Sequence, residues 1–213
     1  MNRPARLVTA ALTASAALLL TACGSGGGAD SSTDKIKGVD QVASSTPSAS
    51  ASAASDVERP EVTLPASFQV TFDGWTNSDA KLQAVMDDGK ERLLGTYAAI
   101  IKQDPQADAV TFYNEGAALT TAQEWVKGLV DEDLTLIGKG QVFDPQVRIS
   151  ADGSGTLFYC VDEGEGSTKN LKTGEVTDTP SDEAYVLYQT KLSKSDDGVW
   201  RTTTVESTRG GCK

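Results

Sequence analysis

The chain has 213 residues, of which 19 are basic, 30 are acidic and none is histidine, so its formal net charge is −11 at pH 7. This acidic balance argues against nucleic-acid partners and against electrostatic docking to anionic lipid. The lack of histidine excludes Ser-His-Asp and Cys-His nucleophilic systems and histidine-based zinc or iron sites.

The N-terminal segment has the pattern of a signal peptide. Arg3 and Arg6 precede an apolar run over residues 7–20, which at about 14 residues is too short to span a bilayer. The run ends in Leu20-Thr21-Ala22-Cys23, which resembles the lipobox of bacterial lipoproteins. We therefore predict a lipoprotein signal peptide over residues 1–22 and exclude it from the fold. The alternative is ordinary secretory cleavage near Ala22, with Cys23 merely following it.

The lipobox resemblance implies a location. A diacylated Cys23, carrying palmitate or a similar chain, would supply two acyl chains, enough for stable anchoring. The domain would then sit on the extracytoplasmic face of the cell membrane, or in the periplasm where an outer membrane exists. The alanine-rich start, with arginine in place of lysine, looks actinobacterial, which favours the first location.

Residues 23–59 are predicted to be a flexible tether. They contain three consecutive glycines at 26–28 and a Ser/Ala-rich run over 44–55, a composition that cannot bury enough apolar surface to fold. A coil of about 36 residues has an end-to-end distance of roughly 30–35 Å. It is either a linker without a recognition role or a stalk that carries O-linked sugar.

Residues 60–213 have the length of one globular domain, about 154 residues. Without Arg3 and Arg6 the chain has 17 basic and 30 acidic residues, a net charge of −13. Once Cys23 takes lipid, Cys160 and Cys212 remain, and an even pair outside the cytoplasm favours a disulfide. It would close a loop of about 53 residues and add roughly 4 kcal/mol by the chain-entropy argument. The alternative is two free thiols.

The predicted elements begin with an extended strand or arm over residues 64–75. A long helix follows, capped by Asn77 or Ser78 and ended by the Asp104-Pro105 step. We expect a second helix over about 107–116 and a third that Thr120 or Thr121 caps. Strands are then predicted over 134–143, 147–150, 156–162, 185–193 and 199–208, with a long polar hairpin end over 163–181. Helices followed by an antiparallel meander indicate an α+β fold.

Over about residues 64–213 the chain resembles the cone-shaped nuclear-transport-factor-like fold, also called SnoaL-like or cystatin-like. More narrowly, it is similar to uncharacterised actinobacterial lipoproteins of that architecture. The resemblance rests on four short motifs: Cys160-Val161-Asp162, Lys172-Thr173-Gly174, Asp197-Gly198-Val199-Trp200 and the terminal Cys212. It implies N-terminal helices packed on a curved antiparallel sheet, with a pocket between them. It implies no single activity, because the fold hosts enzymes, transport factors and assembly modules.

Histidine is absent, and no free thiol remains if the disulfide forms, so carboxylates are the remaining acid/base candidates. Asp162 shares a strand face with Phe158 and Cys160, and its pKa would rise if it pointed into an apolar cone. Alternatively it is a solvated or backbone-bonded aspartate at a strand end. The candidate pocket comprises Asp162, Tyr159, Trp125, Tyr185 and Trp200, although aromatic residues at such periodic positions are more often plain core.

The acidic clusters, among them Asp87-Asp88 and Asp196-Asp197, lack the spacing of a calcium-binding EF-hand loop. We predict that they are solvated turns and helix ends. No phosphate-binding loop or dinucleotide fingerprint appears. The sequence therefore predicts neither a metal nor a cofactor.

The leading prediction is a non-enzymatic, membrane-tethered extracytoplasmic domain. It would bind an envelope protein, a cell-wall component or a small apolar ligand. One alternative is a cone-fold enzyme, isomerase- or dehydratase-like, that uses Asp162 with Tyr159 or Tyr185. Another is an assembly module of envelope machinery, for which the resemblance implies dimerisation through the sheet.

Overall fold

The computed structural model describes residues 57–212, so the predictions for Cys23, the signal peptide and most of the tether lie outside the described residues. The described residues hold the helices α1 (Ala80–Lys102), α2 (Asp108–Tyr113) and α3 (Gly116–Asp131). Their strands are β1 (Phe68–Phe72), β2 (Leu134–Ile149), β3 (Gly155–Asp162), β4 (Gly166–Asn170), β5 (Val176–Asp178), β6 (Tyr185–Lys194) and β7 (Trp200–Arg209).

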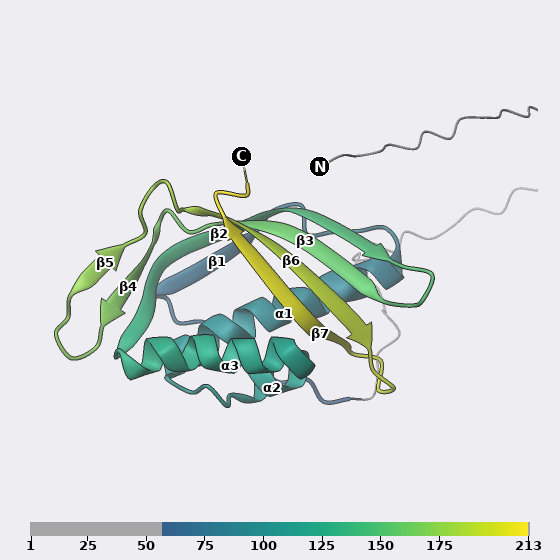
Figure 1. Ribbon diagram of the computed structural model, residues 1–213, viewed down its shortest axis with the longest axis horizontal. Helices are drawn as coiled ribbons and strands as arrows, with labels where there is room; N and C mark the ends of the chain where they lie inside the picture. The colour runs from purple at the N-terminus through teal and green to yellow at the C-terminus, as the bar shows by residue number, and fades with distance from the viewer. Residues whose placement is uncertain (1–56, 213) are drawn as a thin grey trace, which may run out of the picture. The chain divides into compact units, whose positions relative to one another are not determined.

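The strands form one curved sheet, and the three helices lie against one of its faces (Figure 1). The order is β5-β4-β2-β3-β6-β7, all antiparallel, and β1 pairs with β2 in parallel. The predicted α+β fold, with N-terminal helices packed on an antiparallel sheet, is confirmed. We call the helix-covered face of the sheet the inner face and the opposite one the outer face.

Helix α1 crosses the inner face and owes its close packing to two glycines. A Cβ on Gly89 would lie 2.5 Å from Leu157 Cδ2, and one on Gly95 would lie 2.7 Å from the Cβ of Ala109. The sequence marks both residues as weak points of the helix, but each permits a close approach, to β3 and to α2 respectively. The N-cap is Asp79, which accepts from the amides of Lys81 and Leu82, rather than the predicted Asn77 or Ser78.

Two further elements differ from the prediction. The two strands expected over 134–150 form the single strand β2, because a bulge at Asp144 and Pro145 bends the ladder without ending it. Asp144 adopts a left-handed backbone conformation, with φ +50°, at the position where the register shifts. The polar segment 163–181 holds β4 and β5, and α3 begins at Gly116 rather than near Thr120.

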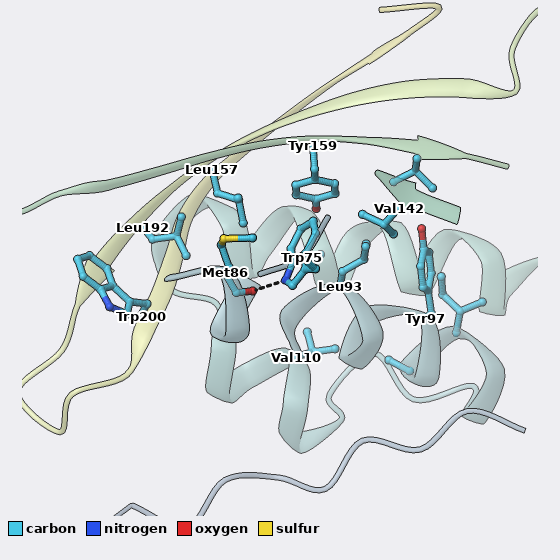
Figure 2. Packing of buried hydrophobic residues seen from close by; sticks show 14 of the residues in the cluster. Trp75, Met86, Leu93, Tyr97, Val110, Val142, Leu157, Tyr159, Leu192 and Trp200 are labelled. Carbon is cyan, nitrogen blue, oxygen red and sulfur yellow. Dashed lines mark hydrogen bonds between the residues drawn. The ribbon is translucent and has the colours of Figure 1, made fainter. Parts of the chain in front are cut away.

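The core lies between α1 and the inner face of the sheet (Figure 2). Trp75 is central to it: its indole N–H donates to the carbonyl of Met86 at 3.0 Å, and its ring meets Tyr159 edge-on at 5.6 Å. Leu93, Leu157 and Val142 are 0–2% exposed beside them. The side chains thus fill the space between α1 and β3.

The predicted disulfide is confirmed. Cys160 of β3 is bonded to Cys212 near the end of the chain, with 6.1 Å between the Cα atoms. It lies on the outer face, because Tyr159 and Val161 point inward on either side of Cys160. Across the described residues, the helices are too short or too polar to traverse a bilayer.

Candidate binding groove and the interior of the fold

The structure does not bring the five predicted pocket residues together. Tyr159 and Trp200 are buried on the inner face, at 1% and 5% exposure (Figure 2). Asp162 and Tyr185 are register partners on the outer face, where Tyr185 meets Phe143 edge-on. Trp125 lies on α3, 41% exposed, with its ring against Tyr97.

Asp162 lies at the end of β3, beside a shallow polar depression of about 260 Å³. Its Oδ1 accepts the amide of Gly164 at 2.8 Å, which forms a local turn. Because β3 alternates its side chains, Tyr159 and Val161 point to the core and Asp162 points away from it. Asp162 is therefore a backbone-bonded aspartate at a strand end, the predicted alternative to a base in the cone.

The interior that would hold a ligand in the resembled fold is occupied by the protein's own side chains. Tyr159 stacks on Tyr188 with 5.2 Å between the rings, and Tyr97 meets Phe68 edge-on at 5.4 Å. With Trp75, these aromatic rings extend along the inner face. An apolar ligand of drug size would have to displace them.

A groove of about 1150 Å³ opens instead at the end of the fold where α1 begins. We call residues 57–64 the N-terminal arm. The groove is lined by the first turns of α1, by the β2–β3 and β6–β7 hairpins, and by Val57 and Arg59 of the arm. Ala80, Ala84, Ile149 and Trp200 contribute apolar surface to it. The groove is larger than the roughly 300–1,000 Å³ of ordinary small-molecule pockets.

An ion pair between Arg59 of the arm and Asp88 of α1 lies at this groove. The Asp88 side chain is 3% exposed and the Arg59 side chain 38% exposed. Asp88 Oδ2 also accepts the amide of Trp200 at 2.8 Å. Burial raises the pKa of Asp88, and the hydrogen bonds from Arg59 and from the amide of Trp200 oppose that rise.

The rest of the groove carries charges of both signs. Lys81 and Lys194 lie along it with Asp87, Glu91 and Asp152. Burial raises the pKa of Glu91, and the neighbouring Lys90 lowers it. Residues 57–212 hold no cluster of three or more histidine, cysteine or acidic side chains arranged for a metal ion. This chemistry suits a ligand that offers apolar groups flanked by charges.

The prediction that Asp87-Asp88 is solvated is wrong for Asp88, which is 2% exposed. Arg92, one turn later, is 6% exposed. A spacing of four residues normally indicates an exposed ion pair on a helix, but Asp88 pairs with Arg59, and Arg92 donates to Asn114 and Tyr159. The available signal was that Asp88, Arg92 and Thr96 border the apolar stripe of α1.

Comparison with known proteins finds no matching family model and no matching curated protein. Among solved structures, the chain is similar to the intermembrane-space region of the chloroplast protein ARC6, with a TM-score of 0.46, 11% identity, and 63% of this chain and 99% of that chain covered. It is also similar to Aln2 from a Streptomyces species, with a TM-score of 0.43 and 11% identity. That match covers 58% of this chain and 89% of Aln2. A third similar structure is a ketosteroid isomerase-like protein from Erwinia carotovora atroseptica, with a TM-score of 0.41 and 19% identity. That match covers 62% of this chain and 97% of the other. Likeness at this level concerns the fold and bears on neither activity nor ligand.

Proposed function

We propose that this protein is a membrane-anchored, extracytoplasmic lipoprotein whose domain binds a polypeptide segment of an envelope protein in the groove beside the N-terminal arm, without catalysis. The observation that carries the proposal is the groove's lining. Its surface combines apolar residues such as Ile149 and Trp200 with charged residues of both signs. Protein–protein interfaces likewise combine apolar surface with polar and charged groups.

The size of the groove supports a polypeptide over a small apolar ligand. At about 1150 Å³ it exceeds the usual range for a small molecule. The interior of the fold, where the resembled family would bind an apolar ligand, is packed with Trp75, Tyr97 and Tyr159. A peptide that places a short apolar side chain near Ile149 and charged groups near Lys81 and Asp152 fits the groove's chemistry.

The placement of Asp162 supports a non-catalytic role. An enzyme that uses Asp162 with Tyr159 or Tyr185 needs the carboxyl and the phenol in one pocket. Asp162 and Tyr185 are on the outer face, and Tyr159 is 1% exposed on the inner face. The sheet therefore separates Asp162 from Tyr159, and Tyr185, which shares the outer face with Asp162, is 43% exposed there rather than enclosed in a pocket.

Site-specific crosslinking in cells tests the binding role. We would place a photoreactive phenylalanine analogue at Lys194, which is exposed on the groove, and at Lys169, which is exposed on β4 away from it. The expected result is a discrete adduct from position 194 only. The charge reversal Lys81→Glu, on the opposite wall, should weaken that adduct. Equal adducts at both positions, or none in membranes that contain the protein, would refute a partner in the groove.

Membrane fractionation tests the anchor separately. The wild-type chain should sediment with membranes and enter the detergent phase, whereas Cys23→Ser should be released or retain its signal peptide. The matched control is a chain in which Cys160 and Cys212 are both replaced by alanine, which should remain in the membrane fraction. Identical partition of Cys23→Ser and wild type would remove the lipid anchor from the proposal.

A further inference from the structure

A second site, separate from the groove, lies on the outer face of the sheet, the face turned away from the helices (Figure 1). We propose that this site binds a short neutral oligosaccharide, which lies against the ring of Tyr185 and in the polar depression beside Asp162. The depression has a volume of about 260 Å³ and shares no lining residue with the groove. The two binding roles can therefore fail or succeed independently.

Four side chains form a row across neighbouring strands of the outer face. Thr71 of β1 is the register partner of Gln141 of β2, which on its other side is opposite Asp162 of β3. Asp162 is in turn opposite Tyr185 of β6. Neighbouring strands lie about 4.8 Å apart, so the row spans roughly 14 Å. This length suits a short oligosaccharide better than a single sugar.

The side chains of the row point away from the core. Val142 and Val161, the chain neighbours of Gln141 and Asp162, are buried on the inner face. Because side chains alternate along a strand, Gln141 and Asp162 point outward, and so do their register partners. The depression is thus open to solvent, and a ligand reaches it without displacing any core residue.

The polar groups of this row are free to bind a ligand. Of the described glutamines, those of the helices, of the loops and at the β2 bulge use their side-chain amides in hydrogen bonds, whereas Gln69, Gln141 and Gln189 on the outer face do not. Asp162 uses Oδ1 for the amide of Gly164, and among the described residues nothing donates to its Oδ2. Sugar hydroxyls both donate and accept, so they can pair with amide and carboxylate groups alike.

An aromatic surface adjoins these polar groups. Tyr185 on β6 meets Phe143 on β2 edge-on, with 6.3 Å between the ring centroids. Strand β3 lies between β2 and β6, so the backbones of those two strands are about 9.6 Å apart. The two rings therefore lean toward each other over β3, close to Asp162. The C–H face of a sugar ring packs on an exposed aromatic ring while its hydroxyls reach the polar groups nearby.

The charge of the site favours a neutral sugar. Asp162 contributes a negative charge, and Glu165 at the rim is already paired with Lys139 at 3.3 Å. The chain as a whole has a net charge of −11. Anionic glycans would therefore be repelled, both by the site and by the rest of the surface.

Saturation-transfer difference NMR tests the site on the full chain, purified in a detergent that has no sugar headgroup. The probes are four neutral trisaccharides: maltotriose, cellotriose, mannotriose and chitotriose. At least one of them should receive saturation from the wild type, most strongly at the ring protons that lie against Tyr185. Titration of that sugar then gives its dissociation constant.

Four variants locate the bound sugar. Tyr185→Ala should weaken binding about tenfold, because it removes the aromatic surface, and Tyr185→Phe should stay within about twofold of the wild type. Gln141→Ala should weaken binding about fivefold by removing hydrogen bonds. The matched control is Gln189→Ala, which removes the same side chain from the same face, opposite Glu206 and outside the depression. It should leave the dissociation constant unchanged.

Three results would overturn the proposal. The first is no saturation transfer to any of the four sugars. The second is the same affinity in Tyr185→Ala as in the wild type, or equal losses in Gln141→Ala and Gln189→Ala, because contact with the sugar would then be general. The third is a dimer that Tyr185→Ala dissociates, together with no bound sugar, since the outer face would then join two copies of the chain.

Discussion

Arg59 and Asp88 lie 29 residues apart in the sequence, and their ion pair fastens the N-terminal arm to helix α1. The arm also packs Val57 and Val62 against the small cluster of Ala109, Tyr113 and Val199. The chain therefore enters the domain along one wall of the groove.

Replacing Arg59 by methionine should destabilise the domain by about 1–2 kcal/mol. Loss of one partner from a fully buried pair costs about 3–5 kcal/mol, but the Arg59 side chain is 38% exposed and solvent screens the pair. Urea unfolding of the two chains gives the difference. The double variant with Asp88→Asn should be more stable than Arg59→Met alone, and a lower stability would contradict the proposed pairing.

The cost of Arg59→Met should also depend on pH. Burial raises the folded-state pKa of Asp88 above its ordinary 3.8. The folded state therefore binds a proton more readily than the unfolded state, and the domain gains stability as the pH falls toward the folded-state pKa. Without Arg59 the pKa of Asp88, and that of Glu91, should rise further. The difference between variant and wild type should therefore be largest near pH 7 and shrink toward pH 5. A difference that stays constant over this range would refute the assignment.

Loss of the disulfide should lower stability by up to about 4 kcal/mol. Cys160 and Cys212 are 52 residues apart in sequence, and the cross-link restricts the unfolded chain. For a domain of this size the melting temperature should fall by about 8–16 °C when both cysteines are replaced by alanine. Reducing agent should lower the wild type to the same temperature and leave the double variant unchanged. A wild-type melting temperature indifferent to reductant would show that the bond contributes nothing.

Gly95→Ala should destabilise the domain even though alanine is the better helix former. The new Cβ would lie 2.7 Å from the Cβ of Ala109, which is fixed to the backbone of α2, so the two helices must move apart. The control is Gly128→Ala on the exposed face of α3, where nothing lies within 4 Å. There the change should stabilise by about 0.5–1 kcal/mol. Effects of the same sign at both positions would contradict the close approach of α1 and α2.

Asp162→Asn should leave stability within about 0.5 kcal/mol of the wild type. Asparagine retains the side-chain oxygen that accepts the amide of Gly164. Crosslinking through the groove should be equally unaffected, because Asp162 is not part of its lining. If the purified chain turned over a substrate and Asp162→Asn abolished the turnover, the non-catalytic role would be wrong.

The elements themselves were largely predictable, because the periodicity of apolar residues is a local property. The apolar stripe of α1 and the alternation in β3 and β6 placed those elements to within a few residues. The bulge in β2 was not predictable, because Asp144-Pro145 resembles a turn and only the pairing with β3 shows that the strand continues. The N-cap of α1 was not predictable either, because several polar residues precede the helix. Only the hydrogen bonds that Asp79 accepts from the first turn identify it as the cap.

The sequence by itself determined three properties. The periodicity of apolar residues predicted the α+β class, the composition excluded histidine chemistry, and the even cysteine count predicted the Cys160–Cys212 pairing. Only the tertiary structure decided which polar side chains are buried. Asp88 and Arg92 look like an exposed pair four residues apart, but the arm and β7 cover the first, and Asn114 and Tyr159 contact the second. Burial depends on segments far away in the sequence, and a local pattern does not contain that information.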